Sequence, residues 1–332
     1  MIITKTPFRM SFFGGGTDFQ PYFEEYGGAV LSTTFDKYAY VSVRHLPRFF
    51  EYRNLLKYSK IEETIQVDEI EHPMVRNAMK LLDMHDLCIS YDADLPARSG
   101  LGSSSSFAVG LLNAFHSLKG QFASKEQLAK EAIYVEREMC EESGGWQDQI
   151  AAAYGGMNRI NFGPDGFEVN PIIIQKERKE QLNNNLMMFF TGFSRFSSEI
   201  EREKTKNMKD KLAELKAMVQ LVDAGEQILT DRHSDLDEFG RLLDHTWKLK
   251  RGLGSTVSTN SIDEIYAKAM ANGALGGKLL GAGGGGFLVF YVPQSRQECV
   301  RKAMKDMLYI PFSFEDSGTK VLYYRPEEYA DK

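Results

Sequence analysis

Cysteine is scarce in this chain of 332 residues, and its three cysteines, Cys88, Cys140 and Cys299, form no C-x-x-C pair. An odd number of widely separated cysteines argues against a disulfide framework and against a zinc cluster. The apolar runs are too short for a membrane span, and the N-terminus lacks the basic region and apolar run of a secretory signal. We therefore expect a cytoplasmic protein without a membrane partner.

The chain also lacks a strong excess of charge of one sign. Its net charge is −6, which gives no indication of a nucleic-acid partner. The histidines form no H-x-x-x-H pair, and no G-x-x-x-x-G-K-[S/T] loop is present. The chain does have 29 glycines and a hydrophobic fraction of 42%, which is ample for a large core. At roughly 100–200 residues per domain, we expect two domains.

Irregular alternation of strands and helices, with dense turn signals, predicts an α+β protein. We expect strands over residues 2–13, several within 29–44, one over 89–93, more within 157–174, and single strands over 186–190 and 287–291. Helices are expected over 68–85, from 107, from 124 to 142, and over 146–153, 197–224, 235–251 and 261–272. The last of these and the helix from 124 begin with the capping-box pairs Ser261/Glu264 and Ser124/Gln127. Polar residues 175–185 interrupt the pattern, so we divide the chain into domains 1–175 and 186–332.

A loop rich in serine and glycine, residues 99–106, leads directly into an apolar helix. Glycines allow close backbone approach to a ligand, and a helix N-terminus offers free N–H groups to an anion. The loop is therefore expected to bind a phosphate, with serine hydroxyls available as oxygen ligands for Mg²⁺. The alternative is an ordinary serine cap after a glycine turn. The residues expected to bind the cofactor are Ser99, Gly100, Leu101, Gly102, Ser103, Ser104 and Ser105.

A second glycine cluster, residues 273–286, contains a literal G-x-G-x-x-G. A dinucleotide-binding fingerprint should follow a strand and open a helix, whereas this cluster follows a helix and opens a strand. A flexible linker is the remaining alternative, but apolar structure flanks the cluster on both sides. We interpret it as a backbone wall against substrate or phosphates, with Gly283 and Gly284 as substrate-binding residues and Lys278 facing phosphate or solvent.

Three blocks together resemble the GHMP kinases, the superfamily of galactokinase, homoserine kinase, mevalonate kinase and phosphomevalonate kinase. They are the P-F-R-M-S-F-F-G-G-G-T-D block at 7–18, the P-A-R-S-G-L-G-S-S-S-S block at 96–106 and the glycine cluster at 273–286, in the family's order. The resemblance implies an ATP- and Mg²⁺-dependent kinase. Its N-terminal domain would be like the second domain of ribosomal protein S5, and its C-terminal domain would be ferredoxin-like.

Within the family, the G-G-G-T-D, G-W-Q-D-Q and T-G-F-S-R segments are most similar to the branch that phosphorylates the anomeric hydroxyl of D-glycero-D-manno-heptose 7-phosphate. The product of that branch feeds nucleotide-activated heptose for bacterial surface polysaccharide. Fucose kinases share a similar G-G-G-T-D block, so an L-fucose or galactose kinase stays an alternative. A non-catalytic sugar and ATP sensor is a further one, although it would be expected to lack the metal or base residue.

The resemblance also assigns residue roles. Asp148 would lie at the accepting hydroxyl, and Arg9 would favour its carboxylate form and stabilise the developing alkoxide. Ser104 and Glu136 would hold Mg²⁺, Glu136 because it lies twelve residues before Asp148 as in the galactokinase-like branch. Sugar contacts are expected from Gly15, Gly16, Thr17 and Asp18, and contacts to a substrate phosphate from Arg98 or Arg195, because arginine can grip phosphate with two parallel bonds.

Overall fold

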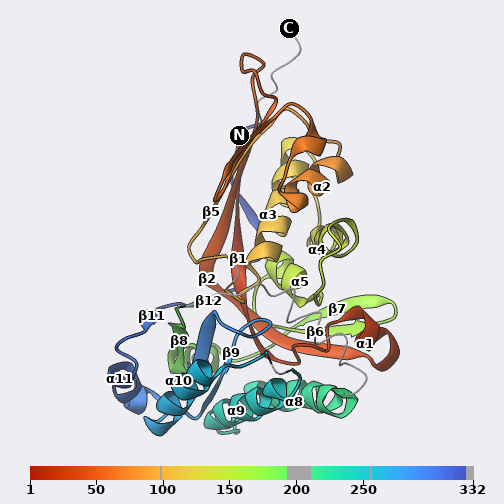
Figure 1. The fold of residues 1–332 in the computed structure, drawn as a ribbon. Coiled ribbons are helices and arrows are strands. Elements are labelled where there is room, and N and C mark those ends of the chain that lie inside the picture. The colour runs from red at the N-terminus through yellow and green to blue at the C-terminus, as the bar shows by residue number, and fades with distance from the viewer. Residues whose placement is uncertain (98, 193–210, 255, 327–332) are drawn as a thin grey trace.

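The structure is a computed structural model, and it describes residues 1–97, 99–192, 211–254 and 256–326 (Figure 1). Within that part of the chain, the strands form a nine-stranded sheet and a four-stranded sheet. Helices α2 to α5 lie on one side of the large sheet (Figure 1). Helices α8 to α11 lie with the small sheet at the bottom of the same view. The chain is therefore a mixed α and β protein built on two sheets.

The large sheet has the order β13-β1-β2-β5-β3-β4, with β6, β7 and β12 joined to it through β2. Its longest strands are β1 and β2, which pair antiparallel along nearly their whole length. The expected strand over residues 2–13 is confirmed. The strands of this sheet are β1 (Ile2–Phe13), β2 (Gly28–His45), β3 (Asn54–Lys57), β4 (Ile61–Thr64), β5 (Leu87–Ala93), β6 (Asn158–Gly163), β7 (Gly166–Pro171), β12 (Phe314–Glu315) and β13 (Lys320–Tyr324).

The expectation of several strands within 29–44 is wrong, because β2 is a single strand. The polar residues Asp36 and Lys37 lie at a register shift within it, where Pro7 pairs with Tyr38 and the next residue, Phe8, pairs with Phe35. A β-bulge of this kind lets polar residues leave the ladder without ending the strand.

The helices that cover the large sheet differ from expectation mainly at their ends. The predicted helix over 68–85 is a 3₁₀ turn, η1 (Val67–Glu69), followed by α2 (Pro73–Leu81), because Pro73 occupies the first helical turn. Ser124 does cap the next helix, since its Oγ accepts from Gln127 N at 3.1 Å. The others are α1 (Gln20–Tyr26), α3 (Ser103–Leu118), α4 (Lys125–Tyr134), the π-helix η2 (Val135–Met139) and α5 (Gln147–Tyr154).

Residues 175–185, which interrupt the pattern in the sequence, are not irregular in the structure, because most of them form helix α6 (Lys176–Asn185). Only Leu182 and Asn185 are buried in it, so its sequence lacks the apolar periodicity that would have indicated a helix. The Ser261/Glu264 capping box is also wrong. Helix α10 (Asn260–Ala271) begins earlier, with Thr259 Oγ1 accepting from Ile262 N.

The small sheet has the order β11-β8-β10-β9, and all its pairs are antiparallel. Two β-α-β passages in this strand order are the ferredoxin-like arrangement. Helix α8 ends at Thr230 rather than near residue 224, and residues 197–210 of that predicted helix lie outside the described residues. The elements are β8 (Leu186–Phe190), α8 (Leu212–Thr230), α9 (Asp237–Arg251), α10, β9 (Gly276–Leu279), β10 (Phe287–Tyr291), α11 (Gln294–Ala303) and β11 (Leu308–Ile310).

The last two strands return to the large sheet, where β12 pairs with β2 and β13 pairs with β1. The division into domains 1–175 and 186–332 stays a prediction. Strands β12 and β13 belong to the second range but pair with strands of the first. A shared core joins the two sheets, since Phe12 and Phe13 of β1 both meet the ring of Phe239 on α9 edge to face. Among the helices that the structure describes, none has the length and apolar character needed to span a bilayer.

Candidate active site

The serine-glycine loop lies between β1 and the second glycine cluster. Gly102 caps α3 in a left-handed conformation, with φ of 74°, and the free N–H groups of the helix begin at this point. A Cβ on Gly100 would lie 2.4 Å from the carbonyl oxygen of Leu280, so only glycine fits there. The two glycine clusters, nearly 180 residues apart in the sequence, therefore pack against each other through their backbones. This juxtaposition leaves the N-terminus of α3 available to an anion.

Arg9 and Asp148 form a bidentate pair beside this loop. Arg9 donates from Nε to Asp148 Oδ1 at 2.7 Å and from Nη2 to Oδ2 at 2.8 Å, and its Nη1 donates to the carbonyl of Gly100 at 2.6 Å. Gly102 is close to both side chains, because a Cβ there would be 3.3 Å from Asp148 Oδ2 and from Arg9 Cγ. The predicted catalytic pair is thus brought together at the edge of the serine-glycine loop.

Asp18 is buried a short distance from Asp148. Its carboxylate accepts from the backbone N–H of Gly16 at 2.9 Å and from both the backbone and the Nε2 of Gln147, at 3.3 and 3.0 Å. Burial raises the pKa of Asp18, the nearby charge of Asp148 raises it further, and the backbone donors oppose the shift. Gly145 has to be a glycine, because a Cβ would lie 1.8 Å from Asp18 Oδ2.

This raised pKa predicts a pH dependence of stability. A carboxyl group whose pKa is higher in the folded than in the unfolded state stabilises the fold at pH values below its ordinary pKa of 3.8. That stabilisation is lost as the pH rises through the pKa of the folded state. We expect the free energy of unfolding of the wild type to fall relative to that of Asp18→Asn as the pH rises from 3.8, measured by urea unfolding at a series of pH values.

Asp231→Asn provides a control of opposite sign. Hydrogen bonds from His233 and Ser234 lower the pKa of Asp231, so here the wild type should gain stability relative to the variant as the pH rises. Parallel profiles for the wild type and Asp18→Asn would contradict the raised pKa of Asp18.

Glu136 is almost fully buried, although its sequence neighbours are charged. It lies in the π-helix η2, a kind of irregular turn that often occurs at functional sites. Its Oε1 accepts from Ser104 Oγ and its Oε2 from Ser105 Oγ, both at 2.9 Å, and Gln149 Nε2 also donates to Oε2. The predicted metal pair, Ser104 and Glu136, is therefore in direct contact at the first turn of α3.

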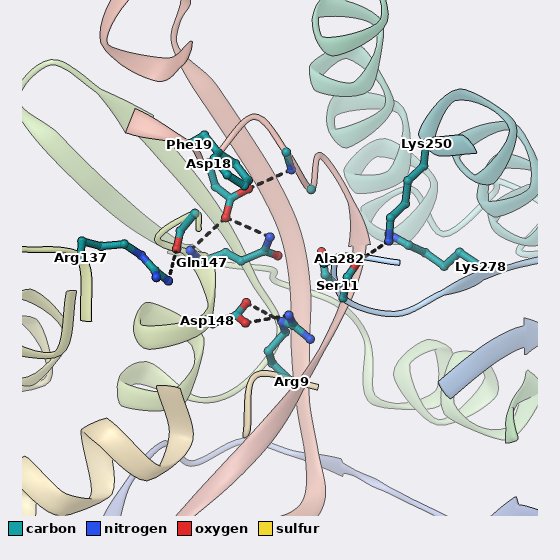
Figure 2. A pocket seen from close by; sticks show the side chains of 14 residues that line it. Arg9, Ser11, Asp18, Phe19, Arg137, Gln147, Asp148, Lys250, Lys278 and Ala282 are labelled. Atoms are coloured by element: carbon teal, nitrogen blue, oxygen red, sulfur yellow. Dashed lines mark hydrogen bonds and ion pairs between the residues drawn. The ribbon is translucent and has the colours of Figure 1, made fainter. Parts of the chain in front are cut away.

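A pocket opens beside Asp18 and the Arg9–Asp148 pair (Figure 2). Within it, Ser11 Oγ, Gln147 Oε1 and Arg137 Nε are buried polar atoms without a hydrogen-bond partner among the described residues. Such atoms are costly unless a ligand or water satisfies them. The lining residues are Arg9, Ser11, Gly15, Gly16, Asp18, Phe19, Arg137, Gly145, Gln147, Asp148, Lys250, Lys278, Gly281 and Ala282.

Three of the predicted substrate contacts lie at this pocket, and three others that the structure describes do not. Gly15, Gly16 and Asp18 line it, whereas Thr17 is turned inward and donates to the carbonyls of Gly14 and Ala29. Gly283 and Gly284 pack against Val257 instead, and the neighbouring Gly281 and Ala282 line the pocket. Arg98 and Arg195 lie outside the described residues.

Sequence reasoning missed Ser11, Arg137, Gln147 and Lys250 as pocket residues. Gln147 and Ser11 belong to the blocks that we identified, but neither had been given a role. Lys250 comes from α9 and donates to the carbonyls of Leu279 and Gly281. No local pattern distinguishes Arg137 or Lys250 from surface residues, because each lies in a charged helical segment.

Comparison with known proteins reveals matches over most of the chain. The family models described as "GHMP kinases N terminal domain" and "GHMP kinases C terminal" match residues 72–156 and 226–310. The D-glycero-alpha-D-manno-heptose 7-phosphate kinase of Campylobacter jejuni is 31% identical over 96% of this chain and 98% of its own length.

Two further relatives differ in substrate. A crystal structure described as a D-glycero-D-manno-heptose 1-phosphate kinase from Bacteroides thetaiotaomicron superposes with a TM-score of 0.79, at 25% identity, over 97% of this chain and 99% of that one. The bifunctional fucokinase/GDP-fucose pyrophosphorylase of Arabidopsis thaliana is 26% identical over 85% of this chain but only 29% of its own length. Both heptose kinases are matched along almost their whole chains, whereas the fucokinase is matched over less than a third of its length.

Proposed function

The chain belongs to the GHMP kinase family, and on this premise we propose that it transfers the γ-phosphoryl group of ATP to the anomeric hydroxyl of D-glycero-D-manno-heptose 7-phosphate. Both heptose kinase relatives are named for a heptose that already carries one phosphate. Their names differ in where that phosphate is. The 7-phosphate leaves the anomeric hydroxyl free as the acceptor, and it is the substrate named for the 31% identical relative.

The observation that carries this proposal is the position of the Arg9–Asp148 pair, between the phosphate loop and the pocket with Asp18. Phosphoryl transfer depends on positioning and on neutralising charge, with a group that orients the attacking hydroxyl. We assign that group as Asp148, which would accept the hydrogen bond and then the proton of the acceptor hydroxyl. Arg9 would hold the carboxylate in place and stabilise the oxyanion as it forms.

The sugar would be recognised by the buried polar atoms of the pocket that lack a hydrogen-bond partner among the described residues. Ser11 Oγ and Gln147 Oε1 have no partner among the described residues, and both line the pocket next to Asp18. A polyhydroxylated ligand supplies both donors and acceptors and would satisfy them. Gln147 also holds the Asp18 carboxylate, so it would fix the two sugar-binding groups relative to each other.

Ser104 and Glu136 suit Mg²⁺, which we propose as the metal. They supply a hydroxyl and a carboxylate oxygen 2.9 Å apart, and oxygen ligands are those that Mg²⁺ prefers. Among the described residues, no group of three or more His, Cys, Asp or Glu side chains could hold a metal. A two-ligand site fits an ion that is shared with the phosphates of ATP. When bound, the ion would neutralise phosphate charge, while Ser105 and Gln149 keep the Glu136 carboxylate oriented.

Replacing Glu136 by Gln should raise the Mg²⁺ concentration required for half-maximal activity and weaken ATP binding at limiting Mg²⁺. The amide removes the anionic ligand with little change in shape. We would measure initial rates and nucleotide affinity across a Mg²⁺ titration. Glu131→Gln is the control, because Glu131 is a partly buried carboxylate that is also hydrogen-bonded to neighbouring side chains, those of His116 and Gln127, but does not contact Ser104. Identical Mg²⁺ titrations for Glu136→Gln and the wild type would remove Glu136 from the metal site.

The proposal is tested by coupled ADP release across D-glycero-D-manno-heptose 7-phosphate, the corresponding 1-phosphate, the free heptose, L-fucose and galactose. We expect the 7-phosphate to be turned over with the highest kcat/KM. Preference for L-fucose would favour the alternative suggested by the fucokinase relative and would overturn the heptose assignment. No turnover with any sugar, together with ATP binding, would favour the sensor alternative.

A further inference from the structure

Positive charge exceeds negative charge among the pocket-lining residues. The described residues that line the pocket include four cations, Arg9, Arg137, Lys250 and Lys278, and two carboxylates, Asp18 and Asp148, in a chain whose net charge is −6. Asp148 is already paired with Arg9. A pocket that receives only a neutral sugar has no need of this excess, whereas a sugar that carries a phosphate does.

The remaining cations lie on two different sides of the pocket (Figure 2). Lys250 donates to the carbonyl of Gly281, and Gly281 packs against Gly100, so this lysine is on the side of the phosphate loop. Lys278 donates to the carbonyl of Phe12. Arg137 lies on the other side, where its Nη2 donates to the carbonyl of Gly145, whose Cα in turn abuts the Asp18 carboxylate.

Arg137 is held in a way that leaves binding capacity. Its Nη1 donates to the carbonyl of Glu142 at 3.2 Å and its Nη2 to that of Gly145 at 3.0 Å, which fix the plane of the guanidinium. Gly144 lies against this plane, since a Cβ there would be 2.8 Å from Nη2. Nε has no partner, and no carboxylate oxygen of the described residues lies within ion-pair distance of Arg137. A fixed guanidinium with unused N–H groups is suited to a phosphate.

Arg137 comes to the pocket from η2, directly after the proposed metal ligand Glu136. Glu136 and Arg137 are consecutive, yet Glu136 binds Ser104 and Ser105 on α3 while Arg137 reaches the Gly144–Gly145 turn before α5. The single irregular turn η2 therefore places one residue at the proposed metal pair and the next at the sugar pocket.

We infer that Arg137 binds the phosphate that the sugar substrate carries before the reaction, on the Gly145–Asp18 side of the pocket. The inference rests on the proposed function, because it requires a phosphorylated sugar as acceptor. It differs from the expectation that Arg98 or Arg195 makes this contact. Arg137 would thereby determine the preference for a sugar phosphate over the free sugar, rather than the transfer chemistry.

The test compares kcat/KM for heptose 7-phosphate with that for the free heptose in the wild type, Arg137→Met and Arg137→Lys. We expect Arg137→Met to lower the ratio by at least about 10-fold, the loss of one or more charge-assisted hydrogen bonds. Arg137→Lys should retain part of the ratio, because lysine keeps the positive charge but cannot donate two parallel hydrogen bonds. If Arg137 only supported the fold, its replacement would displace Asp18 through Gly145. The kcat/KM values for the two heptoses would then fall equally, and their ratio would stay unchanged.

Two further variants make the outcome decisive. Arg178→Met is the matched control, because Arg178 is also a part-buried arginine that donates to backbone carbonyls, those of Leu229, Ile228 and Ser234, but lies outside the pocket. It should leave the ratio at the wild-type value. Lys250→Met tests the competing cation. An unchanged ratio in Arg137→Met, or a loss seen in Lys250→Met alone, overturns the inference. A wild type with no preference for the phosphorylated sugar overturns instead the assignment of a sugar phosphate as the substrate and leaves the sugar kinase function standing.

Discussion

Asp148→Asn should lower kcat by at least about 10²-fold, the lower end of the effect of a positioned acid–base group, while ATP affinity stays close to that of the wild type. The asparagine keeps the size of the side chain but loses the proton acceptor and the negative partner of Arg9. The serine-glycine loop keeps a contact that does not involve Asp148, because the backbone N–H of Arg9 donates to the carbonyl of Leu101. Steady-state kinetics and nucleotide titration measure the two quantities.

A stability measurement has to accompany this variant. Arg9 is only 4% exposed, and removing its carboxylate partner leaves a buried charge uncompensated. Asp244→Asn is a suitable control, because the Asp244 side chain is of similar exposure, 18% against 24%, and is also ion-paired, to Lys248, but lies outside the pocket. Normal turnover by a folded Asp148→Asn protein would show that Asp148 neither accepts the proton nor orients the acceptor.

The second large effect concerns the substrate. Heptose 7-phosphate should be used with a kcat/KM on the order of 10²–10⁴-fold above that of the free heptose, since two charge-assisted hydrogen bonds of about 1.5–3 kcal/mol each are lost with the phosphate. Binding energy from a group remote from the reacting hydroxyl can also orient that hydroxyl, so kcat should fall as well as KM rise. The excess of cations in the pocket is the structural reason.

Side-by-side kinetics with both heptoses, at saturating ATP, measure this ratio. Galactose serves as a control for general sugar recognition, because it lacks any phosphate. Equal kcat/KM values for the two heptoses would contradict a substrate-phosphate site anywhere in the pocket, and would leave the sugar kinase function standing.

Local signals in the sequence were sufficient for the parts of the site that are continuous in the chain. The strand over 2–13 and the serine cap at Ser124 are both present as predicted. The glycine pattern at 100–102 predicted a phosphate loop, and Gly100 and Gly102 do have the left-handed φ values that favour glycine. The family resemblance then brought Arg9 and Asp148 together, 139 residues apart, which no local pattern could do.

What the sequence could not reveal depends on long-range packing. Glu136 is buried although its sequence neighbours are charged, and it lies in a π-turn that periodicity does not predict. Strands β12 and β13 return to the first sheet through pairings with β2 and β1, more than 270 residues away in sequence. Helix α6 escaped notice because nearly all of its residues are polar.

The central claim is that the chain moves a phosphoryl group from ATP to the anomeric oxygen of a phosphorylated heptose, and ³¹P NMR of the reaction mixture tests it most directly. With ATP, Mg²⁺ and heptose 7-phosphate, the account predicts ADP and one new phosphate signal coupled to the anomeric proton, beside the unchanged 7-phosphate, and no such signal with Asp148→Asn. ADP formed together with inorganic phosphate alone, or a new phosphate on any other carbon, would contradict it.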